Sequence, residues 1–207
     1  TGLLDRDVVL GNALVDMYTK CGSVIKAQEV LHELRIRNVI TWSILIAGYA
    51  QQGQGHEAMN CFEQMKYEGL HPDVISFVSI LQACVIIGAI EKGNQLHDEI
   101  VRRGLLNKNA LLGNALIDMY AKCGVFGKAL QVLEEIPIRN IISWNALIGG
   151  YTQLGRDCEA FTCFQVMQHE GLSPDVVTFI CILKACSNLT AIKTGKQIHD
   201  EIVRREL

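Results

Sequence analysis

The chain has 207 residues, of which 49% are hydrophobic and 20% charged, so it holds enough apolar material for a continuous core. Its formal net charge of −3 excludes a protein that binds nucleic acid through phosphate neutralisation alone, because such proteins are basic. The apolar runs are short and interrupted by charges, well below the roughly 20 residues of a membrane-spanning helix, so no membrane segment is expected.

Two long segments of the chain resemble each other at an offset of 102 positions. GNALVDMYTKCG begins at Gly11 and GNALIDMYAKCG at Gly113; RNVITW and RNIISW follow at the same offset, as do PDVISF and PDVVTF. Each long segment divides into three, because an aliphatic and aromatic opening followed by a polar residue recurs at spacings of 31, 35 and 36. Six short repeats result, which cover residues 8–38, 39–73, 74–109, 110–140, 141–175 and, incomplete, 176–207.

The hydrophobic period inside each short repeat is helical. In the second repeat, apolar residues at i, i+3, i+4 and i+7 are Trp42, Leu45, Ile46 and Tyr49. A similar helical run at i, i+1, i+4 and i+7 follows: Ala58, Met59, Phe62 and Met65. Gly53 and Gly55 lie between these runs and indicate a turn. Asp73 and Asp175 each follow a proline, where an acidic side chain can cap the next helix. We therefore predict helix-turn-helix repeats that stack into a single all-α solenoid over residues 1–207.

The repeat lengths and motifs distinguish between two families of helical repeat. Tetratricopeptide repeats have 34 residues, and WSILIAGY comes close to their pattern, but the lengths here differ and the closing proline is missing. The chain instead resembles the pentatricopeptide repeat family, and more narrowly its plant PLS subclass. GNALIDMYAKCG is similar to the S motif, IISWNALIGGYTQLGRDCEAFTCFQVMQHEGLSPD to the P motif and VVTFICILKACSNLTAIKTGKQIHDEIV to the L motif. The order is then S, P, L, S, P, L.

This resemblance implies a right-handed α-solenoid that binds single-stranded RNA, one base per repeat, as a non-enzymatic specificity module for organellar RNA editing or processing. It also implies a plant mitochondrion or chloroplast, although TGLLDRDVVLGNAL lacks the layout of a targeting peptide. The alternative from another class is a protein-docking α-solenoid without RNA selection.

The resemblance also assigns roles to residues. The second residue of each repeat is aliphatic and would stack on bases, although a first-turn core position is the other interpretation: Val9, Ile40, Ile75, Leu111, Ile142 and Val177. The fifth residue and the last residue of a repeat would select the base, or the asparagines and aspartates could act only as helix caps: Asn12 with Asn38, Ser43 with Asp73, Asn114 with Asn140, and Asn145 with Asp175. The predicted target is 5′-Y-G-N-Y-U-N-3′.

The two L repeats depart from this pattern, because their fifth residues, Val78 and Ile180, cannot hydrogen-bond a base. We expect spacers there, or a surface for small protein partners, since similar L motifs in the plant subclass bind the multiple organellar RNA editing factors. Lys20 and Lys122 end the first helix of each S repeat, where they could contact phosphate or simply face the helix dipole.

Signals for catalysis, metal or cofactor binding are weak. HDE at His97 and again at His199 matches half of a zinc deaminase signature, but the P-C-x-x-C half is absent, so no enzyme activity is expected. Six of the eight cysteines recur in pairs 102 positions apart and none forms a CxxC motif, which favours reduced thiols and no zinc site. Trp42 and Trp144 have core spacing. No cofactor is expected.

Overall fold

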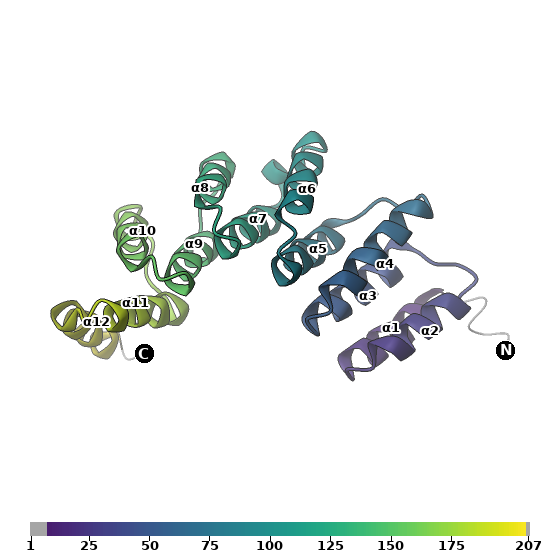
Figure 1. Cartoon of the computed structure of the whole chain (residues 1–207), viewed down its shortest axis with the longest axis horizontal. Coiled ribbons are helices and arrows are strands. Elements are labelled where there is room, and N and C mark those ends of the chain that lie inside the picture. Colours follow the sequence, from purple (N-terminus) through teal and green to yellow (C-terminus); the bar gives the residue numbers. More distant parts are fainter. Residues whose placement is uncertain (1–7, 206–207) are drawn as a thin grey trace. The chain divides into compact units, whose positions relative to one another are not determined.

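The computed structural model describes residues 8–205, and every regular element in this range is a helix. In chain order these are α1 (Val8–Lys20), α2 (Val24–Glu33), α3 (Val39–Gln51), α4 (Gly55–Tyr67), α5 (Val74–Ile87), α6 (Ile90–Arg102), the short 3₁₀ helix η1 (Leu106–Lys108), α7 (Ala110–Lys122), α8 (Phe126–Glu135), α9 (Ile141–Gln153), α10 (Asp157–His169), α11 (Val176–Asn188) and α12 (Ile192–Arg204) (Figure 1). The all-α class predicted from the sequence is confirmed.

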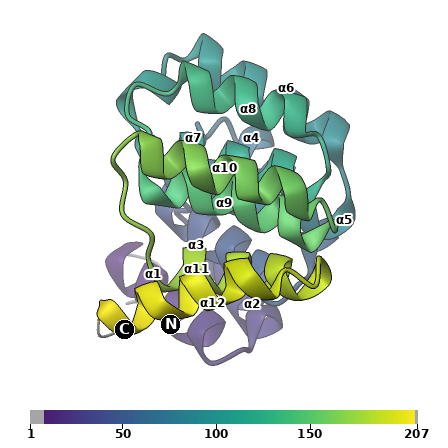
Figure 2. The same cartoon turned by 90° about the vertical axis from the view of Figure 1, so that its left-hand side faces the viewer.

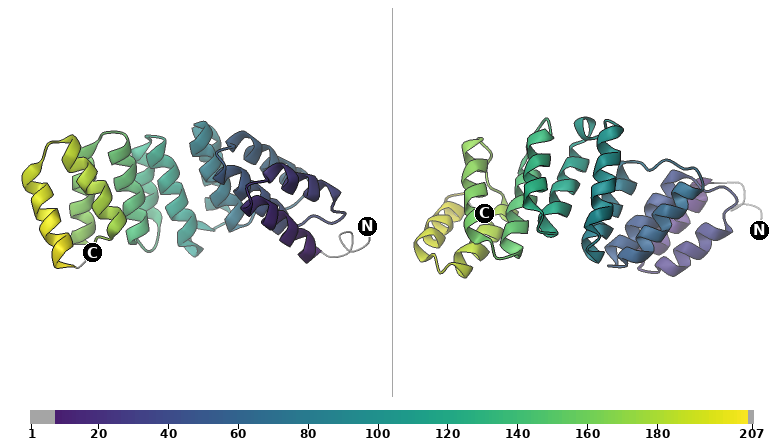
Figure 3. Two further views of the ribbon diagram at one scale, coloured as in Figure 1. Left: turned by 90° about the horizontal axis from the view of Figure 1, so that it is seen from below. Right: turned by 45° about the horizontal axis from the view of Figure 1, so that its top comes forward.

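The chain divides into two compact units, Thr1–Glu99 and Ile100–Leu207. In the first unit, α1, α3 and α5 pack in series, while α2 lies against α1 and α3, and α4 lies against α3 and α5 (Figure 3). In the second unit, α7, α9 and α11 form the equivalent series, α8 and α10 cover it, and α12 packs on α11 (Figure 2). Each unit therefore has a layer of first helices and a layer of second helices, as expected for stacked hairpins.

Four first helices begin with a reciprocal capping box. Asn38, Asp73, Asn140 and Asp175 are the N-caps of α3, α5, α9 and α11, and each accepts a hydrogen bond from a backbone amide three residues later. The Ser or Thr at that later position bonds back to the cap backbone amide, which satisfies two groups that a helix start leaves unpaired. The predicted capping by Asp73 and Asp175 is confirmed. Gly53 forms the expected turn, whereas Gly55 already begins α4.

The two tryptophans belong to the core, as their spacing predicts. Trp42 is fully buried and its Nε1 donates to Glu68 Oε2 over 3.0 Å, while Trp144 donates to Glu170 Oε2 over 2.9 Å. Arg37 pairs with Glu68 at 3.0 Å, so one carboxylate receives both donors. The Trp42 indole therefore links α3 to Glu68, the residue that follows α4.

Two glycines set the close approach of neighbouring first helices. A Cβ on Gly48 in α3 would lie 2.6 Å from Thr19 Cγ2, and one on Gly150 in α9 would lie 2.5 Å from Ala121 Cβ and 3.0 Å from the Ala121 carbonyl carbon. Only a residue without a side chain fits such contacts. These positions consequently help to fix the spacing between α1 and α3 and between α7 and α9.

All eight cysteines lie within the described residues and are free thiols. Burial, together with the nearby Glu57, raises the pKa of Cys61 to about 12; burial, with Glu159, raises the pKa of Cys163 to about 11. Over residues 8–205, no group of three or more His, Cys, Asp or Glu side chains is arranged to hold a metal ion. No helix in the same range is long and apolar enough to span a bilayer.

Candidate nucleic-acid interface

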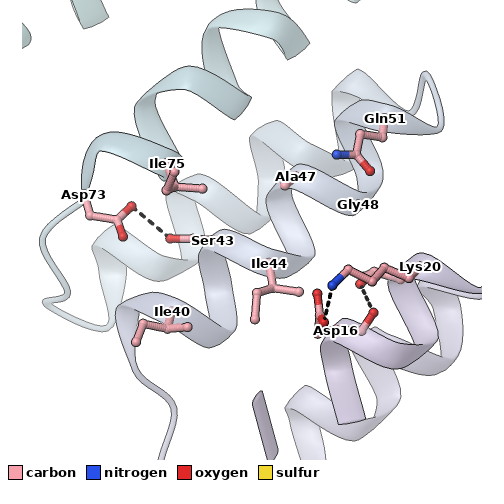
Figure 4. A pocket seen from close by; sticks show the side chains of 11 residues that line it. Asp16, Lys20, Ile40, Ser43, Ile44, Ala47, Gly48, Gln51, Asp73 and Ile75 are labelled. Carbon is pink, nitrogen blue, oxygen red and sulfur yellow. Dashed lines mark hydrogen bonds and ion pairs between the residues drawn. The ribbon is translucent and has the colours of Figure 1, made fainter. Parts of the chain in front are cut away.

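A cleft of about 320 Å³ in the first unit collects several of the predicted site residues. Ser43 and Asp73 lie together on its wall, with Ile75 on one side of Ser43 and Ile40 on the other, and Lys20 lies at the far end (Figure 4). The cleft is open to solvent and lined by α1, α3 and the start of α5. It combines apolar side chains with a hydrogen-bonding carboxylate, and recognition of an unstacked base uses a stacking surface together with hydrogen-bonding groups.

The fifth and last residues of the second repeat are in direct contact. Ser43 Oγ lies 3.1 Å from Asp73 Oδ1, 2.7 Å from Ser76 Oγ and 2.7 Å from the Val39 carbonyl oxygen. The Asp73 Oδ1 atom also accepts from the Ser76 amide at 2.8 Å and from the Ser76 hydroxyl at 2.6 Å. Each hydrogen bond described for this carboxylate ends on Oδ1, so capping and contact with Ser43 share one oxygen and Oδ2 remains for a ligand.

The fifth and last residues of the fifth repeat also meet. Asn145 Nδ2 donates to Asp175 Oδ1 over 2.9 Å, and Thr178 Oγ1 lies 2.7 Å from Asn145 Oδ1 and 2.9 Å from Asp175 Oδ1. Burial acts to raise the pKa of Asp175, but the hydrogen bonds from the Thr178 amide, the Asn145 side chain and the Thr178 hydroxyl outweigh it, so the pKa is lowered. The carboxylate is therefore ionised at neutral pH and acts only as an acceptor.

The two pairs in the S repeats differ from each other. Thr41 Oγ1 lies 2.7 Å from Asn12 Oδ1 and 2.8 Å from Asn38 Oδ1, so this hydroxyl bridges the first pair. In the second pair, Asn114 is 7% exposed and its Oδ1 has no hydrogen-bond partner among the described residues. Asn140 Oδ1 accepts from the Ser143 amide at 3.0 Å. The same pair of asparagines is thus bridged by a hydroxyl in the first S repeat and not in the second.

The second residues of the repeats lie at the surface. Their exposed fractions range from 47% to 75%, which excludes a role as core residues of the first turn; they are Val9, Ile40, Ile75, Leu111, Ile142 and Val177. Exposed aliphatic side chains at a fixed position in successive repeats provide flat apolar contacts. Their role in base stacking stays a prediction, and their exposure is the condition that it requires.

The two lysines proposed for phosphate contact form ion pairs within their own helices. Lys20 Nζ lies 2.7 Å from Asp16 Oδ2, and Lys122 Nζ lies 2.8 Å from Asp118 Oδ2. Both pairs are exposed, where a salt bridge contributes little to stability. Each carboxylate offsets the positive charge that a phosphate would meet, so we expect at most a weak electrostatic contribution from these positions.

The L repeats differ from the others at the fifth position. Val78 is half-buried and Ile180 is 61% exposed. Asn109, which closes the first L repeat, accepts a hydrogen bond from the Leu111 amide at 3.1 Å and so caps α7. No polar pair forms at either fifth position, consistent with spacers. Protein binding by these residues stays a prediction.

The structure adds a group of residues that the sequence analysis did not assign. These are the third residues of four repeats, whose hydroxyls contact the cap or the preceding fifth residue: Thr41, Ser76, Ser143 and Thr178. Their signal was present in NVIT, DVIS, NIIS and DVVT, in which a Ser or Thr follows the cap by three positions.

The series of stacked helical hairpins defines an α-helical repeat protein. The model of the PPR repeat family matches residues 37–86 and 139–188, and the PPR repeat model matches residues 12–39 and 114–141. The chain belongs to the pentatricopeptide repeat (PPR) family.

Relatives in Arabidopsis thaliana agree with this assignment. A chloroplastic pentatricopeptide repeat-containing protein is 37% identical over 95% of this chain and 32% of its own length. A mitochondrial one is 37% identical over 95% of this chain and 19% of its own length. The chain thus spans about a third or less of these relatives.

Solved structures confirm the repeat solenoid. The maize pentatricopeptide repeat protein PPR10 matches with a TM-score of 0.75 at 21% identity, over 95% of this chain and 29% of that protein. The PPR domain of Arabidopsis thaliana protein-only RNase P 1, solved in complex with tRNA, matches with a TM-score of 0.51 at 13% identity, over 95% of this chain and 91% of that domain.

Acid should selectively weaken the start of α11. Folding lowers the pKa of Asp175, so the ionised carboxylate stabilises the folded protein at pH values above the ordinary pKa of 3.8. This stabilisation is lost as the pH falls through the pKa of Asp175 in the folded protein. We expect the difference in unfolding free energy between the natural chain and Asp175→Asn to shrink from about pH 6 to about pH 3. Urea denaturation of both proteins at a series of pH values measures the two unfolding free energies. A difference between them that does not vary with pH would contradict this expectation.

Proposed function

We propose that this chain binds single-stranded RNA and selects bases one per repeat, as a non-enzymatic module. The observation that carries the proposal is the contact between fifth and last residues, Ser43 with Asp73 and Asn145 with Asp175, beside exposed aliphatic second residues. Each S or P repeat then offers one apolar face for stacking and one polar group for the Watson–Crick edge, whereas the L repeats offer the apolar face alone. The six repeats act together as one array in this proposal.

The chemistry of each pair gives a base preference. Asp73 Oδ2 can accept from guanine N1–H or N2–H, and the short Ser43 leaves room for a purine. Asn145 fills more of that space and, with Asp175, favours uracil through its N3–H. Asn12 with Asn38 and Asn114 with Asn140 favour a pyrimidine, and the L repeats have no preference. The proposed target is 5′-Y-G-N-Y-U-N-3′.

The charge distribution supports binding through bases more than through phosphates. The formal net charge is −3, and the two lysines predicted to contact phosphate, Lys20 and Lys122, are paired with aspartates. Few counterions would be released on binding, so the affinity should depend weakly on salt compared with a basic RNA-binding protein. Stacking and edge contacts then supply most of the affinity.

We further propose that this protein acts in organellar RNA editing or processing. The support is the S, P, L order of the repeats and the chloroplastic and mitochondrial relatives. In this proposal the L repeats contact small protein partners of the editing-factor class through the surface around Ile180 and Val78, because Ile180 exposes an aliphatic side chain.

A binding titration at low salt tests the proposed function. The chain should prefer an RNA carrying UGAUUA over one carrying UAAUUA by about tenfold, which corresponds to about 1.4 kcal/mol and to one good base contact. Ser43→Asn should abolish this preference, because the longer side chain occupies the space of the purine. Asn145→Ser, the matched change 102 positions later, should leave the preference at the second base intact.

Two other outcomes would overturn the proposal. Equal and strongly salt-dependent binding of both RNAs would indicate a nonspecific RNA-binding protein. No binding by the folded chain would favour the alternative, a solenoid that docks a protein on the same face. Circular dichroism of each variant establishes that the helices are intact.

A further inference from the structure

Four hydroxyl groups at the starts of first helices are completely buried. They belong to the third residues of their repeats, and each has an exposed fraction of 0%: Thr41, Ser76, Ser143 and Thr178. A buried hydroxyl requires hydrogen-bond partners, since leaving one unpaired is costly. The capping box provides one partner, the backbone amide of the cap residue, at 2.9–3.3 Å. The second partner is what distinguishes the four sites.

In three of the four sites, the second partner includes the fifth residue of the preceding repeat. Thr41 contacts Asn12, Ser76 contacts Ser43 and Thr178 contacts Asn145, each over 2.7 Å. These contacts join residues 29 to 33 positions apart. The third residue of one repeat thus reaches the polar side chain that the previous repeat presents.

The fourth site lacks this contact. Ser143 Oγ donates to the Asn140 carbonyl oxygen at 2.7 Å, and the buried Asn114 Oδ1 is left without a partner in the part of the chain that the structure describes. The helices α3 and α9 both keep the capping box, but Thr41 Oγ1 contacts Asn12, whereas Ser143 Oγ donates to the Asn140 carbonyl oxygen. The second S repeat is therefore an internal control for the loss of this contact.

At the fifth repeat, Asp175 and the Thr178 hydroxyl both contact the Asn145 amide. An asparagine side chain has an oxygen and a nitrogen of nearly equal shape, and only its hydrogen bonds distinguish its two orientations. Here Asn145 Nδ2 donates to Asp175 Oδ1, which requires the oxygen to face Thr178. A hydroxyl can donate to that oxygen. One N–H of Asn145 and one lone pair on its oxygen then remain for a base.

We propose that the third residue of a repeat, where its hydroxyl contacts the fifth residue of the preceding repeat, is a positioning residue for base selection by that preceding repeat, and that Thr178 fixes the Asn145 amide for this purpose. The inference rests on the proposed function and adds a residue to the selecting pair. Thr178 is completely buried, so it does not touch the base itself and acts through Asn145. In the second S repeat, Asn114 lacks such a partner, because the hydroxyl of Ser143 in the next repeat points away from it. The orientation of Asn114 is then not fixed, and this repeat selects its base less strongly.

Three variants of the full chain test the role of Thr178. Thr178→Val removes the hydroxyl and keeps the branched shape, and Thr178→Ser restores the hydroxyl. Ser143→Ala is the matched control, because it removes a capping-box hydroxyl that does not contact a fifth residue. The first readout is the ratio of dissociation constants for UGAUCA and UGAUUA, which differ only at the base assigned to Asn145. A second ratio, for UAAUUA and UGAUUA, reports on Ser43.

We expect Thr178→Val to reduce the uracil preference about tenfold and leave the guanine preference unchanged. Thr178→Ser should restore the uracil preference, and Ser143→Ala should keep it. A merely structural role of Thr178 would weaken both preferences together, or neither. A folded Thr178→Val chain with an unaltered uracil preference would overturn the proposal.

A second readout does not depend on RNA. The side-chain NH₂ signals of Asn145 in ¹⁵N NMR spectra, assigned by their absence in Asn145→Ser, should shift in Thr178→Val and remain in place in Ser143→Ala. If the natural chain shows no base preference, the proposed function fails, and these signals still decide the positioning role. Unshifted Asn145 signals in Thr178→Val would overturn it.

Discussion

Replacing Trp42 with alanine should lower the free energy of unfolding by about 3–5 kcal/mol, the usual range for removing a buried large aromatic side chain. Trp42 is among the largest completely buried side chains of the protein. The substitution leaves a cavity and also removes the Nε1 donor to Glu68, whose remaining described partner is Arg37. Urea denaturation followed by far-UV circular dichroism measures the loss.

Two control substitutions define the outcome. Tyr67→Ala removes another large aromatic side chain from the same unit, but Tyr67 is 92% exposed, so its change in unfolding free energy should stay within about 0.5 kcal/mol. Trp42→Phe retains most of the volume and isolates the loss of the indole donor. A loss below about 1 kcal/mol for Trp42→Ala would contradict the described core.

Gly150→Ala should destabilise the protein by about 1–3 kcal/mol, because a methyl group at this position would overlap the Ala121 methyl group and press on the Ala121 backbone across the α7–α9 contact. The adjacent Gly149 gives a matched control. A Cβ there meets only Cys181 Sγ at 3.7 Å, an ordinary contact distance. Gly149→Ala should therefore be neutral or stabilise by up to about 1 kcal/mol through its higher helix propensity.

The same urea titration compares the two alanine variants. Combining Gly150→Ala with Ala121→Gly removes the clashing methyl group from α7, so it should recover part of the loss. Equal stabilities of Gly149→Ala and Gly150→Ala would show that the helices move apart at little cost. In that case Gly150 would not fix the spacing between α7 and α9.

The fold could be predicted because its signals are local. Hydrophobic spacing places the helices, and the Pro-Asp dipeptides before Val74 and Val176 mark where α5 and α11 begin. The buried tryptophans follow from the same spacing. The aliphatic second residues were ambiguous, because a first-turn position can face the core or solvent with the same helical period. Their exposure depends on how neighbouring repeats pack.

From the sequence we could pair Ser43 with Asp73 and Asn145 with Asp175, which lie in contact, but could not predict their hydrogen bonds. Capping and base contact were treated as alternatives for Asp73, whereas one carboxylate oxygen serves as the cap acceptor and contacts Ser43. The direction of the Ser143 hydroxyl cannot be inferred from its capping box, since Ser76 makes the cross-repeat contact from the same box. The pairing of Lys20 with Asp16 follows from their i, i+4 spacing in the sequence and lowers the expectation of a phosphate contact at Lys20.

Because of the capping boxes, a segment of this chain that is exchanged with another repeat protein should not begin at the repeat boundary. Each box joins the last residue of one repeat to the third residue of the next, as Asp73 joins Ser76. If repeats of two proteins were joined between Asp73 and Val74, the Asp73 carboxylate and the Ser76 hydroxyl would come from different proteins. A cut between Ser76 and Phe77 keeps Ser43, Asp73 and Ser76 in one segment. Junctions between recombined repeats should therefore lie three residues after each repeat boundary.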